Sequence, residues 1–196
     1  MSRQDFNDKI INDAVTILKD DGVIVIPTDT VYGLACSGNS EEGLKKIYSI
    51  KKRNINKKLP IIVDSYERLL SLCEVNEETL RKLKPFFPGE LTLILNKKNS
   101  EETFAVRMIN NEIVNKIIEG LDSFLYLTSA NKSDEDPIAD IGDLLDEFDG
   151  KVDMIVMGNK MKGVNSTIVD LTGRELRLVR EGSILFSKIE EVYNRG

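Results

Sequence analysis

Apolar residues along the chain recur in two patterns, one typical of amphipathic helices and the other of buried strands. Helical spacing over residues 6–18 predicts a first helix, and Asp20-Asp21-Gly22 predicts its end with Gly22 at the cap. Further helices are predicted after the N-cap candidates Ser40, Ser65 and Asn76, around residues 113–118, within the acidic segment 134–149, and at the end of the chain.

Short apolar runs rich in β-branched residues predict strands that are buried on both faces. These runs are residues 23–26, 59–63, 91–95, 104–107, 124–127 and 152–157, followed by a polar-to-apolar junction at 163–171 that turns at Thr172-Gly173 into a terminal hairpin. Strands alternate with helices early in the chain and adjoin one another late. We therefore predict an α/β fold, with a single-domain, twisted, mixed β-sheet flanked by helices.

The composition is that of an ordinary folded protein, with 41% apolar and 31% charged residues. A length of 196 residues fits one domain, which we take as residues 1–196 without a further C-terminal domain. No apolar run approaches the roughly 20 residues that span a bilayer, and residues 1–6 lack the apolar core of a signal peptide. Cys36 and Cys73 are too few for a disulfide framework or a zinc site, so we expect a reduced, cytoplasmic location without membrane partners.

The chain contains no histidine, which removes the commonest base and the commonest ligand for transition metals. Catalysis by Ser-His-Asp or Cys-His arrangements is excluded as well. Any reaction must use carboxylates, lysines, hydroxyls, backbone amides or groups of the substrate. The net charge of −6 also argues against a general nucleic-acid binder, which needs a broad basic surface.

Residues 45–58 form a basic window on this acidic chain, with seven lysines or arginines and no acidic residue. A local positive field of this kind is a candidate receptor for a compact polyanion. The alternative is a solvated helix end, where cations are favoured by the helix dipole. The flanks favour the first interpretation, because a Thr-rich strand end precedes the window and the apolar run 59–63 follows it.

Polar residues gather at the ends of four predicted strands, and a tight turn is the alternative explanation for the groups that follow residues 23–26 and 124–127. If the four junctions converge, they form one crevice of hydroxyls, amides and cations with almost no carboxylate. Such a set suits an anionic ligand, and several cations together suit a polyphosphate. The predicted inventory is Thr30, Lys51, Arg53, Arg107, Ser129, Asn131, Ser166 and Arg180.

These residues lie in motifs that resemble the Sua5/YciO/YrdC/YwlC family in its short form. The motifs occur in the family's order from about residue 6 to residue 190, although none is specific by itself. They are Pro27–Leu34, Lys51-Lys52-Arg53 with Lys57 and Leu59, Pro88–Thr92, Ala105-Val106-Arg107, Ser129-Ala130-Asn131, Gly163–Thr167 and Val179–Gly182.

The resemblance implies a YrdC-like fold with a basic, concave cavity and a nucleotidyltransferase reaction. L-Threonine, bicarbonate and ATP would give threonylcarbamoyl-adenylate and pyrophosphate for the t6A37 modification of tRNA, with Mg²⁺ carried by the nucleotide. Carried over by position, the amino acid would be held by Thr30, Arg107 and Ser166, and Thr30 is preferred over Thr28. The nucleotide phosphates would be held by Lys51, Arg53, Lys57, Asn131 and Arg180, with Ser129 between the two ligands and Lys51 and Arg53 catalytic.

The chain departs from the family pattern at three positions. Asn54 stands where many members have proline, Asn165 where glutamate is usual, and Asp136 near a position often occupied by serine. These departures bear on the loop contacts more than on the reaction. We expect residues 132–136 to be the loop that closes over the ligands.

Two other functions remain open at this point. One is a module that binds double-stranded RNA without synthase activity, which the basic window supports and the scarcity of aromatic residues within it opposes. The other is a paralogue that transfers carbamoyl groups from carbamoyl phosphate. The partners implied by the resemblance are the three small substrates, downstream proteins of the tRNA pathway and RNA.

Overall fold

The computed structural model describes residues 3–132, 135–138, 140–158, 162–173 and 175–195, with side chains from residue 7 onward. Its helices are α1 (Arg3–Lys19), α2 (Glu41–Lys51), α3 (Tyr66–Leu72), α4 (Glu77–Leu83), α5 (Glu112–Leu121), α6 (Ile141–Phe148) and α7 (Phe186–Asn194). Its strands are β1 (Ile24–Pro27), β2 (Tyr32–Ser37), β3 (Ile61–Val63), β4 (Cys73–Glu74), β5 (Leu91–Lys97), β6 (Thr103–Met108), β7 (Leu125–Ser129), β8 (Met154–Ile155), β9 (Thr167–Asp170) and β10 (Arg177–Arg180).

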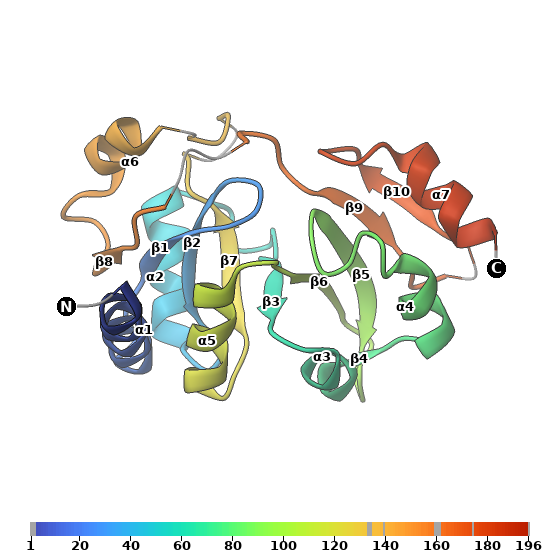
Figure 1. Cartoon of the computed structure of the whole chain (residues 1–196), viewed down its shortest axis with the longest axis horizontal. Coiled ribbons are helices and arrows are strands. Elements are labelled where there is room, and N and C mark those ends of the chain that lie inside the picture. The colour runs from blue at the N-terminus through green and yellow to red at the C-terminus, as the bar shows by residue number, and fades with distance from the viewer. Residues whose placement is uncertain (1–2, 133–134, 139, 159–161, 174, 196) are drawn as a thin grey trace.

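One mixed sheet runs through the described chain in the order β10-β9-β5-β6-β3-β7-β2-β1-β8, and β4 pairs with β5. The pairs β1–β8, β3–β6 and β5–β9 are parallel, and the other pairs are antiparallel. Figure 1 shows β1, β2 and β7 in the left half of the molecule and β5, β6 and β9 in the right half, with β3 between them. The predicted twisted mixed sheet with flanking helices is confirmed.

In the left half, helices cover both faces of the sheet. Apolar residues of α1 and α5 pack on one face, against Ile24, Ile26 and Leu125. Residues of α2 and α6 pack on the other face, against alternate positions such as Val25 and Leu34. Burial on both faces explains why these strands are almost entirely apolar.

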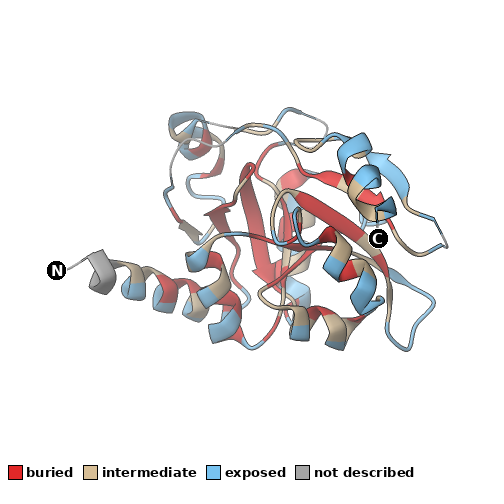
Figure 2. Cartoon of the chain, turned by 45° about the vertical axis from the view of Figure 1, so that its right-hand side comes forward, coloured by how far each residue is buried: buried red, intermediate tan, exposed pale blue. Residues whose placement is uncertain are grey.

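In the right half, α3, α4 and α7 pack against one face of β5 and β6. That face carries Leu91, Leu93 and Leu95 from β5, and Val106 and Met108 from β6. Figure 2 shows buried central strands, whereas β10 at the edge of the sheet is exposed. Successive side chains of a strand point to opposite faces, so the residues between these apolar positions point away from the three helices.

The predicted helix starts are confirmed by their capping hydrogen bonds. The side chain of Ser40 accepts a bond from the amide of Gly43 at 2.8 Å, and that of Ser65 accepts one from Arg68 at 3.1 Å. Asn76 accepts a bond from the amide of Glu78 at 2.7 Å. A capping side chain satisfies an amide that the first helical turn leaves without an intrahelical partner.

Two local predictions were wrong. Strand β2 was not predicted, because its sequence mixes small and polar residues with few long apolar ones. The end of α1 was assigned to Gly22, but Asp21 adopts the left-handed conformation, with φ of 56°. Glycine at 22 is needed for space instead, since a Cβ atom there would lie 2.5 Å from the backbone oxygen of Ile17.

The acidic segment contains the one helix that was predicted for it, α6, but its residues 134 and 139 lie outside the described residues. The strand expected at 152–157 is shorter than predicted, since β8 covers only Met154–Ile155. Among the described residues, no helix has both the length and the apolar character needed to cross a membrane.

Candidate functional site

The guanidinium group of Arg107 is the centre of a buried polar cluster. Arg107 lies near the end of β6, on the face that points away from α3, α4 and α7, and its side chain is 7% exposed. Its Nε donates to the backbone oxygen of Gly89 at 2.9 Å, and Nη1 donates to Oγ1 of Thr30 at 2.9 Å. Its Nη2 donates to Oδ1 of Asp29 at 2.5 Å. Thr30 and Arg107, 77 positions apart in sequence, are therefore brought together as predicted.

Thr30 and Thr28 have different roles in the loop between β1 and β2. The hydroxyl of Thr28 accepts bonds from the amides of Thr30 and Val31 at 3.1 Å each, and donates to the backbone oxygen of Val31 at 2.6 Å. Thr28 therefore shapes the loop itself, whereas the hydroxyl of Thr30 faces Arg107. This geometry supports the preference for Thr30.

A second cluster joins Ser166 to Arg180. Nη2 of Arg180 donates to the backbone oxygen of Ser166 at 2.9 Å, and the hydroxyls of Ser166 and Thr92 lie 2.8 Å apart. The turn at Gly89-Glu90 connects this cluster to Arg107. The oxygen of Gly89 accepts from Arg107, and the oxygen of Glu90 accepts from the amide of Thr167 at 3.1 Å.

The pKa of Arg107 reflects both its burial and its neighbours. Burial lowers the pKa because it disfavours the charged form, and the charge of Arg180 lowers it further. The charges of Asp29 and Glu90 act in the opposite direction. Burial likewise lowers the pKa of Arg180. The structure therefore places two guanidinium groups near each other, together with the carboxylates of Asp29 and Glu90.

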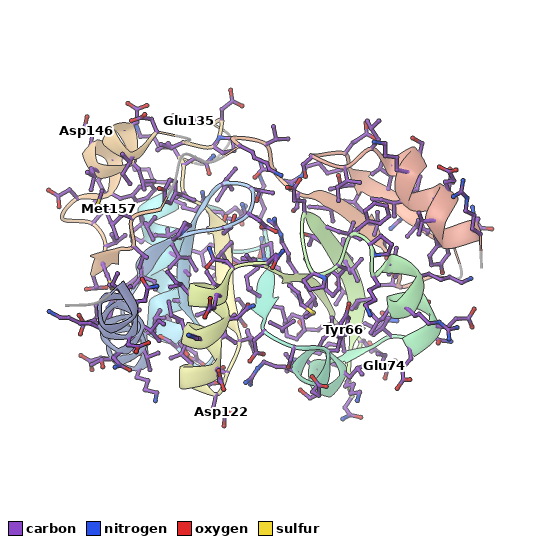
Figure 3. The ribbon with its side chains drawn as sticks, viewed as in Figure 1. Tyr66, Glu74, Asp122, Glu135, Asp146 and Met157 are labelled. Carbon is purple, nitrogen blue, oxygen red and sulfur yellow. The ribbon has the colours of Figure 1, made fainter. Side chains whose placement is uncertain are left out.

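Lys51, the last residue of α2, forms a third cluster with the end of β7. Its ammonium nitrogen Nζ lies 2.6 Å from the backbone oxygen of Ser129 and 2.7 Å from that of Asn131. It also lies 3.1 Å from Oδ1 of Asn131, which accepts a bond from the Ser129 hydroxyl at 2.5 Å. Nδ2 of Asn131 donates to the backbone oxygen of Glu135, a residue at the upper edge of Figure 3.

These contacts define what Lys51 does in the structure. An ammonium group has three N–H donors, and at least three acceptors of the described residues lie within hydrogen-bond distance of this one. Lys51 is also 4% exposed. Lys51 therefore stabilises the turn of Ser129 and Asn131. Its contact with phosphate remains a prediction, and such a contact would replace one of these hydrogen bonds.

Arg53 and Lys57 belong to the loop after α2 rather than to the buried clusters. Nε of Arg53 donates to the backbone oxygen of Lys57 at 3.1 Å, and its Nη2 donates to that of Lys58 at 3.4 Å. Asn54 begins a turn in which its side chain accepts a bond from the amide of Asn56 at 2.9 Å. This turn explains how asparagine serves at a position where proline was expected.

The other two departures lie on different loops. The backbone oxygen of Asn165 accepts a bond from the amide of Ser183 at 3.0 Å, which ties this loop to the segment that follows β10. Asp136 is exposed. The predicted closing loop, 132–136, lies partly outside the described residues.

The start of β2 links the Lys51 cluster to the Arg107 cluster. The backbone oxygen of Tyr32 accepts a bond from the amide of Ala130 at 2.7 Å, and Thr30, two residues earlier, contacts Arg107. The backbone oxygen of Thr30 also lies 3.3 Å from the amide of Gly163. Figure 1 shows the loop between β1 and β2 at the upper end of the left half, where these segments meet.

A cavity of about 670 Å³ lies between α2, the loop after it, and strands β5 and β6, and none of the eight predicted site residues is part of its lining. Its walls include Tyr48, Phe104 and Tyr126, together with Lys45 and Lys58. Ala105 lines it too, and Ala105 and Arg107 are two residues apart on β6, so they point to the same face about 7 Å apart. The cavity therefore adjoins the Arg107 cluster and has the size of a typical ligand pocket.

Two carboxylates of the site were not predicted from the sequence. Asp29 forms an ion pair with Arg107, so the expectation of almost no carboxylate was wrong. Glu90 pairs with Lys162 and is close enough to Arg107 to affect its pKa. Burial would raise the pKa of Glu90, but the hydrogen bond and charge of Lys162 and the charge of Arg107 lower it below its usual range. Both residues lie in motifs that the sequence shows, but only the fold reveals their partners.

Neither cysteine is placed for nucleophilic chemistry. Burial and the charge of Asp21 raise the pKa of Cys36 to about 12, and burial raises that of Cys73 to about 11. Both thiols are therefore protonated at neutral pH. Among the described residues, no three Cys, Asp or Glu side chains lie together in a way that could hold a metal ion.

Comparison with known proteins gives consistent matches over most of the chain. The family model Sua5/YciO/YrdC, described as "Telomere recombination", matches residues 16–182. A curated relative, the threonylcarbamoyl-AMP synthase of Pyrococcus abyssi (strain GE5 / Orsay), is 33% identical over 189 residues, which cover 91% of this chain and 56% of that protein. The chain thus spans little more than half the length of this relative.

Solved structures show the same fold. P. abyssi Sua5 complexed with L-threonine has a TM-score of 0.86 and 33% identity, covering 93% of this chain and 56% of that one. E. coli YciO has a TM-score of 0.81 and 26% identity, covering 89% of this chain and 90% of that one.

Proposed function

The chain belongs to the Sua5/YciO/YrdC family, and from this membership we propose that it is an L-threonylcarbamoyladenylate synthase, an enzyme of the nucleotidyltransferase class. Its substrates would be L-threonine, bicarbonate and ATP, and its products threonylcarbamoyl-adenylate and pyrophosphate. The proposal rests on the curated relative of that name and on a solved relative that is complexed with L-threonine.

The arrangement of Arg107 beside a cavity is the observation of this molecule that supports the proposal most directly. Arg107 combines a cation with neighbouring hydroxyls, a set that suits a small hydroxylated carboxylic acid such as threonine. In our proposal Thr30, Arg107 and Ser166 hold the amino acid. The neighbouring cavity, whose walls combine aromatic side chains and lysines with Glu41 and Glu102, would accommodate the uncharged nucleoside part of ATP.

The phosphates are assigned to the cations and amides at the other side of the site. Arg180 and Asn131 would contact them from the buried clusters, and Arg53, Lys57 and Lys51 from the end of α2 and its loop. Ser129 would lie between the two ligands. Mg²⁺ enters this scheme as part of the substrate, carried by the triphosphate.

The proposed reaction does not require a histidine. Bicarbonate and the amine of threonine form a carbamate, one oxygen of which attacks the α-phosphorus while pyrophosphate leaves. Such a step depends on the alignment of three ligands and on charge stabilisation at phosphorus. Cations such as Arg180 and Arg53 can supply that stabilisation without a protein nucleophile.

The proposed activity also implies a pathway, a location and partners for the chain. The product would serve the t6A modification of tRNA in the cytoplasm, and its partners would be the proteins that transfer threonylcarbamoyl to tRNA. Direct RNA binding remains a prediction from the basic window. We also propose that the domain described here carries the synthase chemistry by itself.

Release of pyrophosphate tests the proposed function. A coupled assay should show release only when threonine, bicarbonate and ATP are all present, and omission of any one should return the rate to background. Release that is independent of threonine, or no release under any of these conditions, would refute the proposal.

A further inference from the structure

The second oxygen of Asp29 is a buried acceptor without a hydrogen-bond donor among the described residues. Oδ1 of Asp29 accepts the bond from Arg107 at 2.5 Å, whereas no donor lies within hydrogen-bond distance of Oδ2. Buried polar atoms without a partner are uncommon in folded proteins, because each costs the free energy of its lost hydration. An oxygen in this position can accept a hydrogen bond from a bound ligand.

The guanidinium group of Arg107, which contacts Asp29, has N–H donors that its contacts in the structure do not use. A guanidinium group carries five N–H bonds, and the contacts to Gly89, Thr30 and Asp29 use three of them. The Arg107 and Asp29 side chains thus present a paired cation and anion, each with hydrogen-bonding capacity left. An α-amino acid carries the complementary pair, a carboxylate and an ammonium group on adjacent atoms.

We propose that Asp29 is the residue that recognises the α-ammonium group of the amino-acid substrate and accepts a proton from it. This inference rests on the proposed function and deepens it, because it assigns the amino end of the substrate, for which the sequence analysis named no residue. In this arrangement Arg107 binds the carboxylate of the amino acid, and Oδ2 of Asp29 accepts a hydrogen bond from the ammonium group.

The proton balance of carbamate formation gives Asp29 its second role. When the amine nitrogen bonds to the carbon of bicarbonate, a C–O bond breaks and hydroxide leaves. The ammonium group loses two protons in the process. One combines with the departing hydroxide to form water, and the other passes to the Asp29 carboxylate. In a chain without histidine, a carboxylate at hydrogen-bond distance is a suitable acceptor.

The structure also defines what must move. Oδ2 is covered, but 15% of the Asp29 side chain is exposed, so part of this side chain reaches solvent. The terminal torsion of an aspartate is soft, because it joins sp³ and sp² carbons. The inference requires this carboxylate to turn toward the amino acid as it enters.

Asp29→Asn is the informative variant, because it keeps the shape of the side chain and an oxygen that can accept the bond from Arg107. Titration calorimetry would compare L-threonine with its 2-hydroxy analogue, in which a hydroxyl replaces the ammonium group, with ATP present. We expect the wild-type protein to prefer threonine by at least about tenfold, and Asp29→Asn to lose that preference. We also expect kcat at saturating threonine to fall about 100-fold or more.

Two results would overturn the inference. One is an Asp29→Asn variant that binds both ligands more weakly by the same factor, which is the result of a purely structural role beside Arg107. The other is a wild-type protein that binds the 2-hydroxy analogue as tightly as threonine, a measurement that remains informative if the variant fails to fold.

Asp64→Asn is the matched control, since Asp64 is also an aspartate that is 15% exposed and paired with an arginine, Arg68, but it belongs to none of the clusters of the site. It should keep the preference for threonine. The inference is separable from the proposed function. If the wild-type protein forms the product and Asp29→Asn keeps the preference for threonine over the 2-hydroxy analogue, only the proposed role of Asp29 is refuted. If the wild-type protein forms no threonine-dependent product, the proposed function falls.

Discussion

The ammonium nitrogen of Lys51 lies 2.6 Å from the backbone oxygen of Ser129, so a hydrogen bond joins the last residue of α2 to the last residue of β7. This contact places a charge of the basic window inside the protein. The structure therefore divides the window into a buried anchor, Lys51, and residues such as Lys52 and Lys57 that remain exposed.

Replacing Lys51 should destabilise the fold. Lys51→Met keeps the length of the side chain but leaves the backbone oxygens of Ser129 and Asn131 without their buried donor. We expect the free energy of unfolding to fall by about 2–4 kcal/mol, as measured by denaturant titration. Lys45→Met is the control, because Lys45 is exposed and forms only a surface ion pair with Glu42. Coincident unfolding midpoints for the two variants would show that Lys51 is not an anchor.

Replacing Arg53 should mainly affect catalysis. Arg53→Ala removes a forked, charge-assisted contact, and we expect kcat/KM for ATP to fall about 30- to 1000-fold. Arg53→Lys should recover little, because an ammonium group cannot reproduce the planar geometry that also reaches the backbone oxygens of Lys57 and Lys58.

Lys46→Ala is the control for this series, because Lys46 is an exposed lysine of the same window that does not line the cavity. Lys52 is less suitable, because it ends α2 with φ of 50° and its replacement alters the helix end. The rates of all variants would be measured at two ionic strengths. Small, similar and salt-screened losses for Arg53 and Lys46 would indicate that the window is only surface charge.

Gly182 provides a test of the Ser166 cluster. A Cβ atom at residue 182 would lie 2.2 Å from the backbone oxygen of Asn165 and 2.5 Å from the carbonyl carbon of Ser166. Gly182→Ala must therefore displace this segment, and we expect a loss of about 1–3 kcal/mol in stability and weaker binding of threonine. Gly173→Ala, at a position with nothing within 4 Å, should change neither quantity. Equal threonine affinities for the two variants would contradict the assignment of Ser166.

The sequence was sufficient for the helix starts, because a cap depends on residues close to one another in the chain. Ser40, Ser65 and Asn76 each accept a bond from an amide two or three positions away. Strand β2 was missed for the opposite reason. Its Gly33 and Ser37 are buried by pairing with β1 and β7, and the local sequence around them does not predict which strands they pair with.

The candidate site was predicted as a set of residues but not as a set of contacts. Thr30 and Arg107 meet as expected, since both follow from motifs at strand ends. The ion pair of Asp29 could not be predicted, because it depends on how the loop after β1 meets β6. The burial of Lys51 could not be predicted from the sequence either, because a lysine at a helix end is usually solvated.

The acid dependence of stability should depend on Asp170, at the end of β9. Burial would raise its pKa, but hydrogen bonds from Thr172 and Arg177 and the charge of Arg177 lower it below its usual range. A carboxylate with a lowered pKa stabilises the fold above its unfolded pKa, about 3.9, and that contribution is lost as the pH falls through the folded value. Asp170→Asn should therefore be less stable than the wild type at pH 7, and the difference should shrink below about pH 4.

Urea titrations at neutral pH and near pH 3 would measure this difference. Asp146→Asn, at an exposed position of α6, is the matched control and should track the wild type at both values. A difference between the wild type and Asp170→Asn that stays constant or grows on acidification would contradict the assignment.

The most direct test of the account is mass spectrometry of the product formed from ¹³C-bicarbonate. The wild-type protein should convert threonine, ATP and labelled bicarbonate into threonylcarbamoyl-adenylate whose mass is higher by one ¹³C atom, and Arg107→Ala should form little of it. We predict the label in the carbamoyl group and pyrophosphate in equal amount. The absence of a labelled adenylate, in a preparation that is folded and binds ATP, would contradict the proposed reaction.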